Sequence, residues 1–69
     1  MNIKDALKEL AIALGATDED FANAKSTKDY LKVVAKKKGA SDVELNGAKT
    51  IREVLLVVAE YAGDGGTNN

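Results

Sequence analysis

Hydrophobic side chains recur every three or four residues in three segments of this chain, with polar and charged residues between them. That spacing places the apolar side chains on one face of an α-helix. The stripes are Ile3, Ala6, Leu7, Leu10, Ala11 and Leu14, then Tyr30, Leu31, Val34 and Ala35, then Ile51, Val54, Leu55, Val58, Ala59 and Ala62. The pattern predicts helices over residues 3–14, 27–38 and 51–62.

The three segments belong to a 24-residue unit that is used two and a half times, as residues 3–26, 27–50 and 51–63. The first two units are identical at ten of the 24 aligned positions, and no gap is needed. Such a repeat indicates one structural unit used again. The sequence therefore predicts an all-α fold, a compact three-helix domain over residues 1–63, followed by a flexible tail over residues 64–69 that has no apolar anchor.

The repeat also predicts where the helices begin and end. Asn2, Ser26 and Thr50 precede the three helices, and an acidic residue follows each of them three positions later. This is the spacing of a helix N-cap and its capping box. Glycine recurs at positions 15, 39 and 63, where a helix ends in a left-handed residue.

The connectors over residues 16–26 and 40–50 each hold one large apolar side chain, Phe21 or Leu45, at the same place. We expect these two side chains to anchor the connectors on the core. Thr17 and Ser41 are potential caps for short helical turns at 18–23 and 42–46.

Composition narrows the possible functions. The 69 residues contain no cysteine and no histidine. Disulfides are thereby excluded, and the commonest general base and transition-metal ligand are missing. The sequence contains no phosphate-binding or dinucleotide motif. We predict a protein that is not an enzyme, with no catalytic, cofactor-binding or metal-ligating residues. A chain this short is marginally stable alone, so self-association is an option.

The formal net charge is −1, from ten basic and eleven acidic residues. This balance argues against a dedicated nucleic-acid binder, which usually has a basic excess. No apolar run approaches the roughly 20 residues of a membrane span. The first residues lack the basic and apolar segments of a signal peptide. We expect a protein that is made in the cytoplasm and does not bind membranes.

The third unit carries two apolar residues, Leu56 and Val57, beside its predicted stripe. Leu56 stands where the other units have Lys8 and Lys32, and Val57 follows it. The third helix is consequently apolar around most of its circumference. Such a helix is either central to a fold or packed against a partner. Both interpretations remain open, and the second makes Leu56, Val57 and Tyr61 a possible protein interface.

Three consecutive lysines, Lys36, Lys37 and Lys38, end the second helix. Cations at a helix C-terminus complement the helix dipole. The alternative is that these lysines contact phosphates of a nucleic acid. The acidic segment from Thr17 to Asp20 lacks the ligand pattern of a calcium-binding loop, and we interpret it as a cap.

Two segments resemble very short phage proteins that are encoded near capsid genes, among them head-fibre and minor head proteins. They are the opening Met1-Asn2-Ile3-Lys4-Asp5-Ala6-Leu7-Lys8-Glu9-Leu10-Ala11 and the string Thr50-Ile51-Arg52-Glu53-Val54-Leu55, continuing to Ala59-Glu60. The resemblance covers the helices and not the connectors. It implies a virion-associated protein that binds a capsid or another virion protein, in repeated copies, and is found in the virion. It identifies no functional residues.

The segment from Leu7 to Gly15, followed by Lys25 to Leu31, resembles the SAP and helix-extended-loop-helix modules. Its connector is longer than theirs. This second resemblance implies a nucleic-acid-binding accessory module that uses lysines of the second helix. Two functions therefore compete: a structural interaction protein, and a small nucleic-acid-binding module.

Overall fold

The computed structural model describes residues 2–62, with side chains through residue 61. These residues form five helices: α1 (Ile3–Ala13), α2 (Asp18–Phe21), α3 (Thr27–Lys37), α4 (Asp42–Gly47) and α5 (Ile51–Ala62). The all-α prediction is confirmed, and each long helix ends within one residue of its predicted position. The predicted tail, residues 64–69, lies outside the described residues.

Side-chain caps begin the long helices, as the repeat predicts. The Asp5 N–H donates to Asn2 Oδ1 over 2.9 Å. The Asp29 N–H donates to Ser26 Oγ over 3.2 Å, and the Asp29 carboxylate accepts the Ser26 N–H in return. Thr50 and Glu53 repeat this reciprocal pair before α5. These bonds satisfy backbone donors that a helix leaves unpaired at its N-terminus.

Glycine ends α1 and α3 in the expected way. Gly15 has φ +103° and Gly39 has φ +116°. The N–H groups after these turns return to the helix, as in Ala16 N–H to Ala11 O and Ala40 N–H to Ala35 O. This is the Schellman arrangement, and it requires a left-handed backbone that glycine adopts at low cost.

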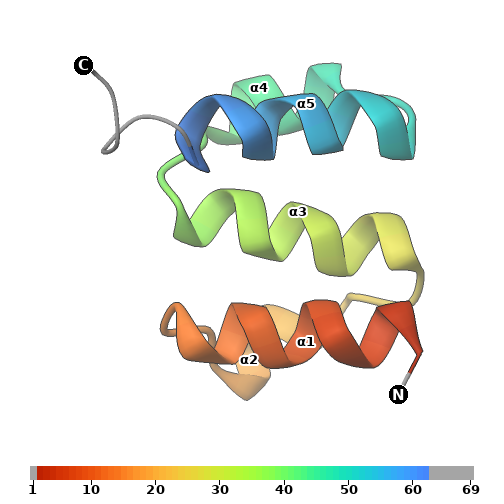
Figure 1. Ribbon diagram of the computed structural model, residues 1–69, viewed down its shortest axis with the longest axis vertical. Helices are drawn as coiled ribbons and strands as arrows, with labels where there is room; N and C mark the ends of the chain where they lie inside the picture. The colour runs from red at the N-terminus through yellow and green to blue at the C-terminus, as the bar shows by residue number, and fades with distance from the viewer. Residues whose placement is uncertain (1, 63–69) are drawn as a thin grey trace.

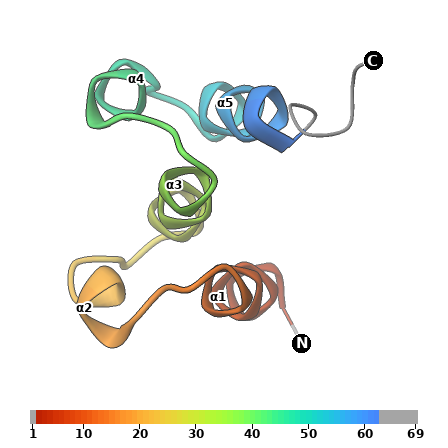
Figure 2. The ribbon, with the colours of Figure 1, turned by 90° about the vertical axis from the view of Figure 1, so that its left-hand side faces the viewer.

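The long helices α1, α3 and α5 lie side by side and run in the same direction, as Figure 1 shows, while the connectors containing α2 and α4 return the chain. Viewed at right angles (Figure 2), α2 and α4 lie on one side of α3, and α1 and α5 lie on the other. Helix α3 packs against both α1 and α5, whereas α1 and α5 do not contact each other. The central helix is thus α3, and α5 is at the end of the array.

A buried cluster lies between α3, α4 and α5. Its members are Leu31, Ala35, Ala40, Leu45, Ala48 and Val54. Leu45 therefore anchors its connector as predicted. Its repeat equivalent Phe21 is partly buried and lies against Tyr30, with ring centroids 5.7 Å apart.

One contact within each of the first two units also repeats. Lys4 Nζ donates to Lys25 O, and 24 residues later Lys28 Nζ donates to Lys49 O. The fold is a short stack of helix pairs, and each of the first two units closes on itself through the same lysine, which bonds the end of the unit's own connector.

Candidate protein-binding surface

Comparing equivalent positions shows that each long helix has two packing faces. Leu31 and Ala35 of α3 are buried in the cluster with α5, while Val34 of α3 is buried outside that cluster. We use "forward face" for the positions of Leu7 and Ala11, of Leu31 and Ala35, and of Leu55 and Ala59. We use "rear face" for the positions of Ala6 and Leu10 in α1. The equivalent positions are Tyr30 and Val34 in α3, and Val54 and Val58 in α5.

Burial along the stack follows these two faces. On the forward face, Ala11 and Ala35 are fully buried, whereas Ala59 is exposed. On the rear face the order is reversed, since Val34 and Val54 are fully buried while Leu10 is 44% exposed. Each forward face thus packs against the rear face of the next helix. No described helix follows α5, and its forward face is left uncovered.

The uncovered forward face of α5 is strongly apolar. Ile51 is 49% exposed, Leu55 53% and Leu56 60%. Ile51, Leu55 and Ala59 follow one another at four-residue spacing, and Leu56 is three residues from Ala59, so the four side chains form a continuous strip. We call these four residues the α5 strip.

Leu56 extends the strip at a position where the other units are charged. Its equivalent Lys32 lines the same depression as Leu45 of α4, and Lys8 lies over the ring of Phe21 of α2, 5.7 Å from its centroid. In both units this position faces the short helix that follows. In α5 the lysine is replaced by leucine, which adds apolar surface where the repeat otherwise places a cation.

The structure separates the three residues that the sequence groups as a possible interface. Leu56 lies on the exposed strip. Val57 and Tyr61 are partly buried and pack against the core cluster on the other side of α5. The Tyr61 hydroxyl donates a hydrogen bond to Glu44 Oε1 of α4.

The sequence pattern assigns Ile51 and Leu55 to the core stripe, but both lie on the surface, as do Ile3 and Leu10 of the α1 stripe. The equivalents of Ile51 are Ile3, which is 67% exposed, and Thr27, which is partly buried. The equivalents of Leu55 are Leu7, which is partly buried, and Leu31, which is buried. The signal that identifies Leu55 as a surface residue is its place in the third long helix of the repeat. A forward-face residue is buried only where another helix follows it.

The opposite end of the stack is less apolar. The rear face of α1 carries Ala6, Glu9, Leu10 and Ala13, where α5 has Val54, Val57, Val58 and Tyr61. Exposed Ile3 and Ile12 are also on α1. These two are nine residues apart, which is about 180° around a helix. Ile3 does share a face with Ala6 and Leu10, so this end has two large exposed apolar side chains on one face, compared with three on α5.

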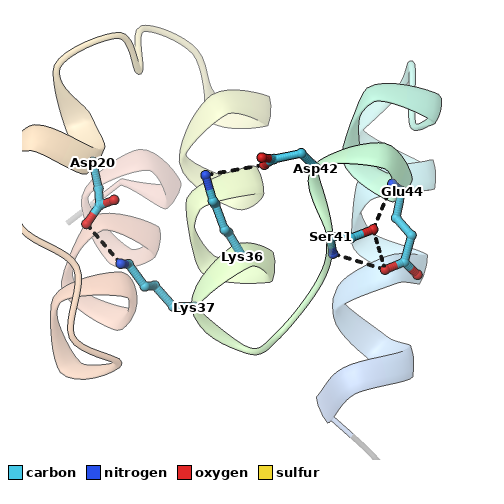
Figure 3. A network of polar contacts seen from close by, with 6 residues as sticks. All are labelled: Asp20, Lys36, Lys37, Ser41, Asp42 and Glu44. Carbon is cyan, nitrogen blue, oxygen red and sulfur yellow. Dashed lines mark hydrogen bonds and ion pairs between the residues drawn. The ribbon is translucent and has the colours of Figure 1, made fainter.

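The lysines at the end of α3 are close to carboxylates (Figure 3). Lys36 Nζ lies 3.2 Å from Asp42 Oδ1, and Lys37 Nζ lies 3.2 Å from Asp20 Oδ2. Lys38 is the C-cap residue of α3. The ion pairs offset the positive charge of Lys36 and Lys37, which weakens a surface for phosphate binding.

A depression of about 280 Å³ lies beside these ion pairs. It is lined by Glu19, Asp20, Lys32, Val33, Lys36, Lys37, Asp42 and Leu45. Its lining holds three lysines and three carboxylates, and no serine, threonine or tyrosine hydroxyl. Among residues 2–62, no group of three or more carboxylates is placed to hold a metal ion.

The carboxylates with shifted pKa values belong to caps. The Thr17 N–H and then Lys37 donate to Asp20 and lower its pKa, and the Lys25 and Ser26 N–H groups lower the pKa of Asp29. The Tyr61 hydroxyl and then the Ser41 N–H lower the pKa of Glu44. Such bonds keep a carboxylate ionised near neutral pH, which is the opposite of what a general acid requires.

Within residues 2–62, none of the helices combines the length and the apolar content needed to cross a bilayer. Comparison with protein families, curated proteins and solved structures found no match for this chain. The fold itself defines the class: an all-helical protein built from an internal repeat, with an apolar strip at one end of the stack.

Proposed function

We propose that this chain is a non-enzymatic interaction protein that binds another protein through the α5 strip, and that it does so as a virion-associated protein of a phage. The observation that carries the first part is the exposure of Ile51, Leu55 and Leu56 on one helix. The equivalent forward faces of α1 and α3 are covered by the next helix, so the surface already has the form of a helix-binding face.

The non-enzymatic part is supported by the side chains available. The sequence has no histidine or cysteine, and the carboxylates with lowered pKa values are engaged in helix caps or in bonds to Lys37 and Tyr61. None of these carboxylates is poised to exchange a proton near neutral pH.

The virion part is supported by the resemblance of the α1 and α5 segments to short phage proteins encoded near capsid genes. A small protein that presents one apolar strip suits attachment in many copies to a repeating shell. The partner of this proposal is a capsid protein or another protein of the virion.

The test is co-sedimentation with purified phage particles from cells that express tagged variants of the chain. The disrupting variant is Leu55→Lys with Leu56→Lys, which places two charges on the strip. The matched control is Ile12→Lys, because Ile12 is 47% exposed and lies on α1. Far-UV circular dichroism must show that all three proteins keep their helical content.

The original chain and the Ile12→Lys control are expected in the particle fraction, at a constant ratio to the major shell protein measured by quantitative mass spectrometry. The Leu55→Lys/Leu56→Lys variant is expected to stay in the supernatant. Equal recovery of this variant with particles, or absence of the original chain from particles, would refute the proposal.

A further inference from the structure

We propose that the α5 strip binds the same strip of a second copy of this chain, as an antiparallel pair of α5 helices related by a two-fold axis near Leu56. The inference rests on the proposed function, since it uses the same surface and names an occupant for it. It is argued from the contacts within the stack, from the difference between its two ends and from the charges beside the strip.

The contacts within the chain show that a forward face is built to receive a helix. Leu31 and Ala35 pack against α5 and α4, and they retain 4% and 0% of their exposure. Leu55 and Ala59 present the same residue types at the same positions of α5. A helix from a second copy would cover them through its own forward face, whereas α5 covers Leu31 and Ala35 through its rear face.

The second copy has two surfaces to offer, and the end of the stack at α1 is the poorer one. At its rear face, Ala6 and Ala13 replace the larger side chains found in α3 and α5, and Glu9 replaces a valine. Leu10 and Ile3, which lies seven residues earlier on the same side of α1, are the large apolar side chains there, compared with three on the α5 strip. Terminal units of repeat proteins commonly have such a polar outer face. The α5 strip itself is the better apolar match, and pairing like with like gives a closed two-fold dimer.

The charges beside the strip favour an antiparallel pair. Arg52 and Glu60 lie four residues before and four residues after Leu56. In an antiparallel pair centred on Leu56, Arg52 of each copy faces Glu60 of the other, so the attraction occurs twice. A parallel pair would place like charges together. Within the described part of the chain, neither Arg52 nor Glu60 forms an ion pair.

The size of the surface sets the strength of the dimer. Helix α5 has 12 residues and is about 18 Å long. A pair of such helices buries less than about 1,200 Å² in total, which is typical of weak and transient interfaces. The dimer should therefore form and dissociate in a concentration-dependent way.

Cross-linking tests the geometry directly, because the chain has no cysteine of its own. Leu56→Cys places two thiols next to the two-fold axis, and mild oxidation should convert it to a covalent dimer. Ile12→Cys is the matched control, with similar exposure on α1 and no expected partner. Cross-linking of Leu56→Cys no faster than that of Ile12→Cys would overturn the proposal.

Sedimentation equilibrium on the purified chain tests the charges. Arg52→Glu is expected to raise the dimer dissociation constant about 4- to 30-fold, since two attractive pairs become repulsive. Adding Glu60→Arg should restore it to within a few-fold of the original. A chain that stays monomeric up to about 1 mM, where weak complexes are populated, would contradict the inference. A double variant that dimerises no more tightly than Arg52→Glu would also contradict it. The same holds for open-ended assemblies that Leu10→Lys weakens, because these would form through the end of the stack at α1.

These outcomes are separable from those of the proposed function. A monomeric chain that still reaches phage particles through Leu55 and Leu56 would refute the dimer and keep the function. A dimer that never associates with particles would keep the inference and refute the virion assignment.

Discussion

Replacing the same residue at two equivalent positions measures how the stack uses its forward faces. Leu31 and Leu55 are each the fifth residue of a long helix, so Leu→Ala changes helix propensity almost equally at both. They differ in surroundings, because Leu31 is 4% exposed and Leu55 is 53% exposed. A difference in the free energy of unfolding between the two variants therefore reports packing.

The magnitudes follow from burial. Leu31→Ala removes a nearly buried side chain and leaves space between α3, α4 and α5, at a cost of about 2–5 kcal/mol. Leu55→Ala removes a side chain that is already half in water and leaves no cavity. Its cost should stay below about 1 kcal/mol. For a domain of this size, each kcal/mol corresponds to roughly 4–8 °C in melting temperature.

The assay is urea unfolding followed by far-UV circular dichroism at the lowest workable concentration, so that self-association does not contribute. Because Leu31→Ala threatens the fold of so small a domain, the pair Leu31→Val and Leu55→Val provides a milder comparison, with a loss of roughly 0.8 kcal/mol expected for the one buried methylene. If Leu55→Ala in dilute solution proves as damaging as Leu31→Ala, the α5 strip is covered within a single chain, and both proposals lose their basis.

Three further outcomes are expected. Gly39→Ala should destabilise the fold by about 1–2 kcal/mol because the backbone at Gly39 is left-handed. The control Gly47→Ala should be neutral or stabilising, because Gly47 lies at the end of α4 with open space around it. Equal melting temperatures of the two variants would contradict this. Hydrogen bonds from the Lys25 and Ser26 N–H groups lower the pKa of Asp29 in the folded state. The stability that this carboxylate contributes is therefore present above its unfolded pKa, near 4, and is lost as the pH falls through the lower folded pKa. Asp29→Asn should flatten the fall of the urea midpoint between about pH 4 and pH 2; an unchanged slope would count against the cap. Because carboxylates offset Lys36 and Lys37 within Lys36–Lys38, fluorescence anisotropy should detect no binding to duplex DNA at about 20 mM salt; binding there that weakens with added salt would revive the nucleic-acid alternative.

Helix boundaries follow from local chemistry, and the sequence predicts those of the long helices to within a residue, whereas α2 ends two residues before its predicted end. Ser26 is followed by Asp29, and Gly39 ends the same helix, so α3 is determined by residues inside its own unit. The short helices α2 and α4 are predictable for the same reason, since Thr17 and Ser41 precede them. These features depend on bonds between residues that are close in the sequence.

The position of each helix in the stack does not follow from local chemistry. A stripe of apolar residues shows which face of a helix is buried, but it does not name the neighbour that buries it. Leu55 belongs to the same stripe position as Leu31, yet its burial depends on whether another helix follows. Tyr61 illustrates the converse, because its ring packs on the core through contacts with α4 that residue spacing does not reveal.

The separation of α1 from α5 has a consequence for how the protein loses its structure. Since these helices do not touch, stability is the sum of two interfaces that share α3, and each is coupled only to its neighbour. Helix α1 can detach while the cluster between α3, α4 and α5 stays closed, and amide hydrogens of α1 should then exchange before those of α3. A destabilising substitution in α1 weakens one interface, whereas such a substitution in α3 weakens both.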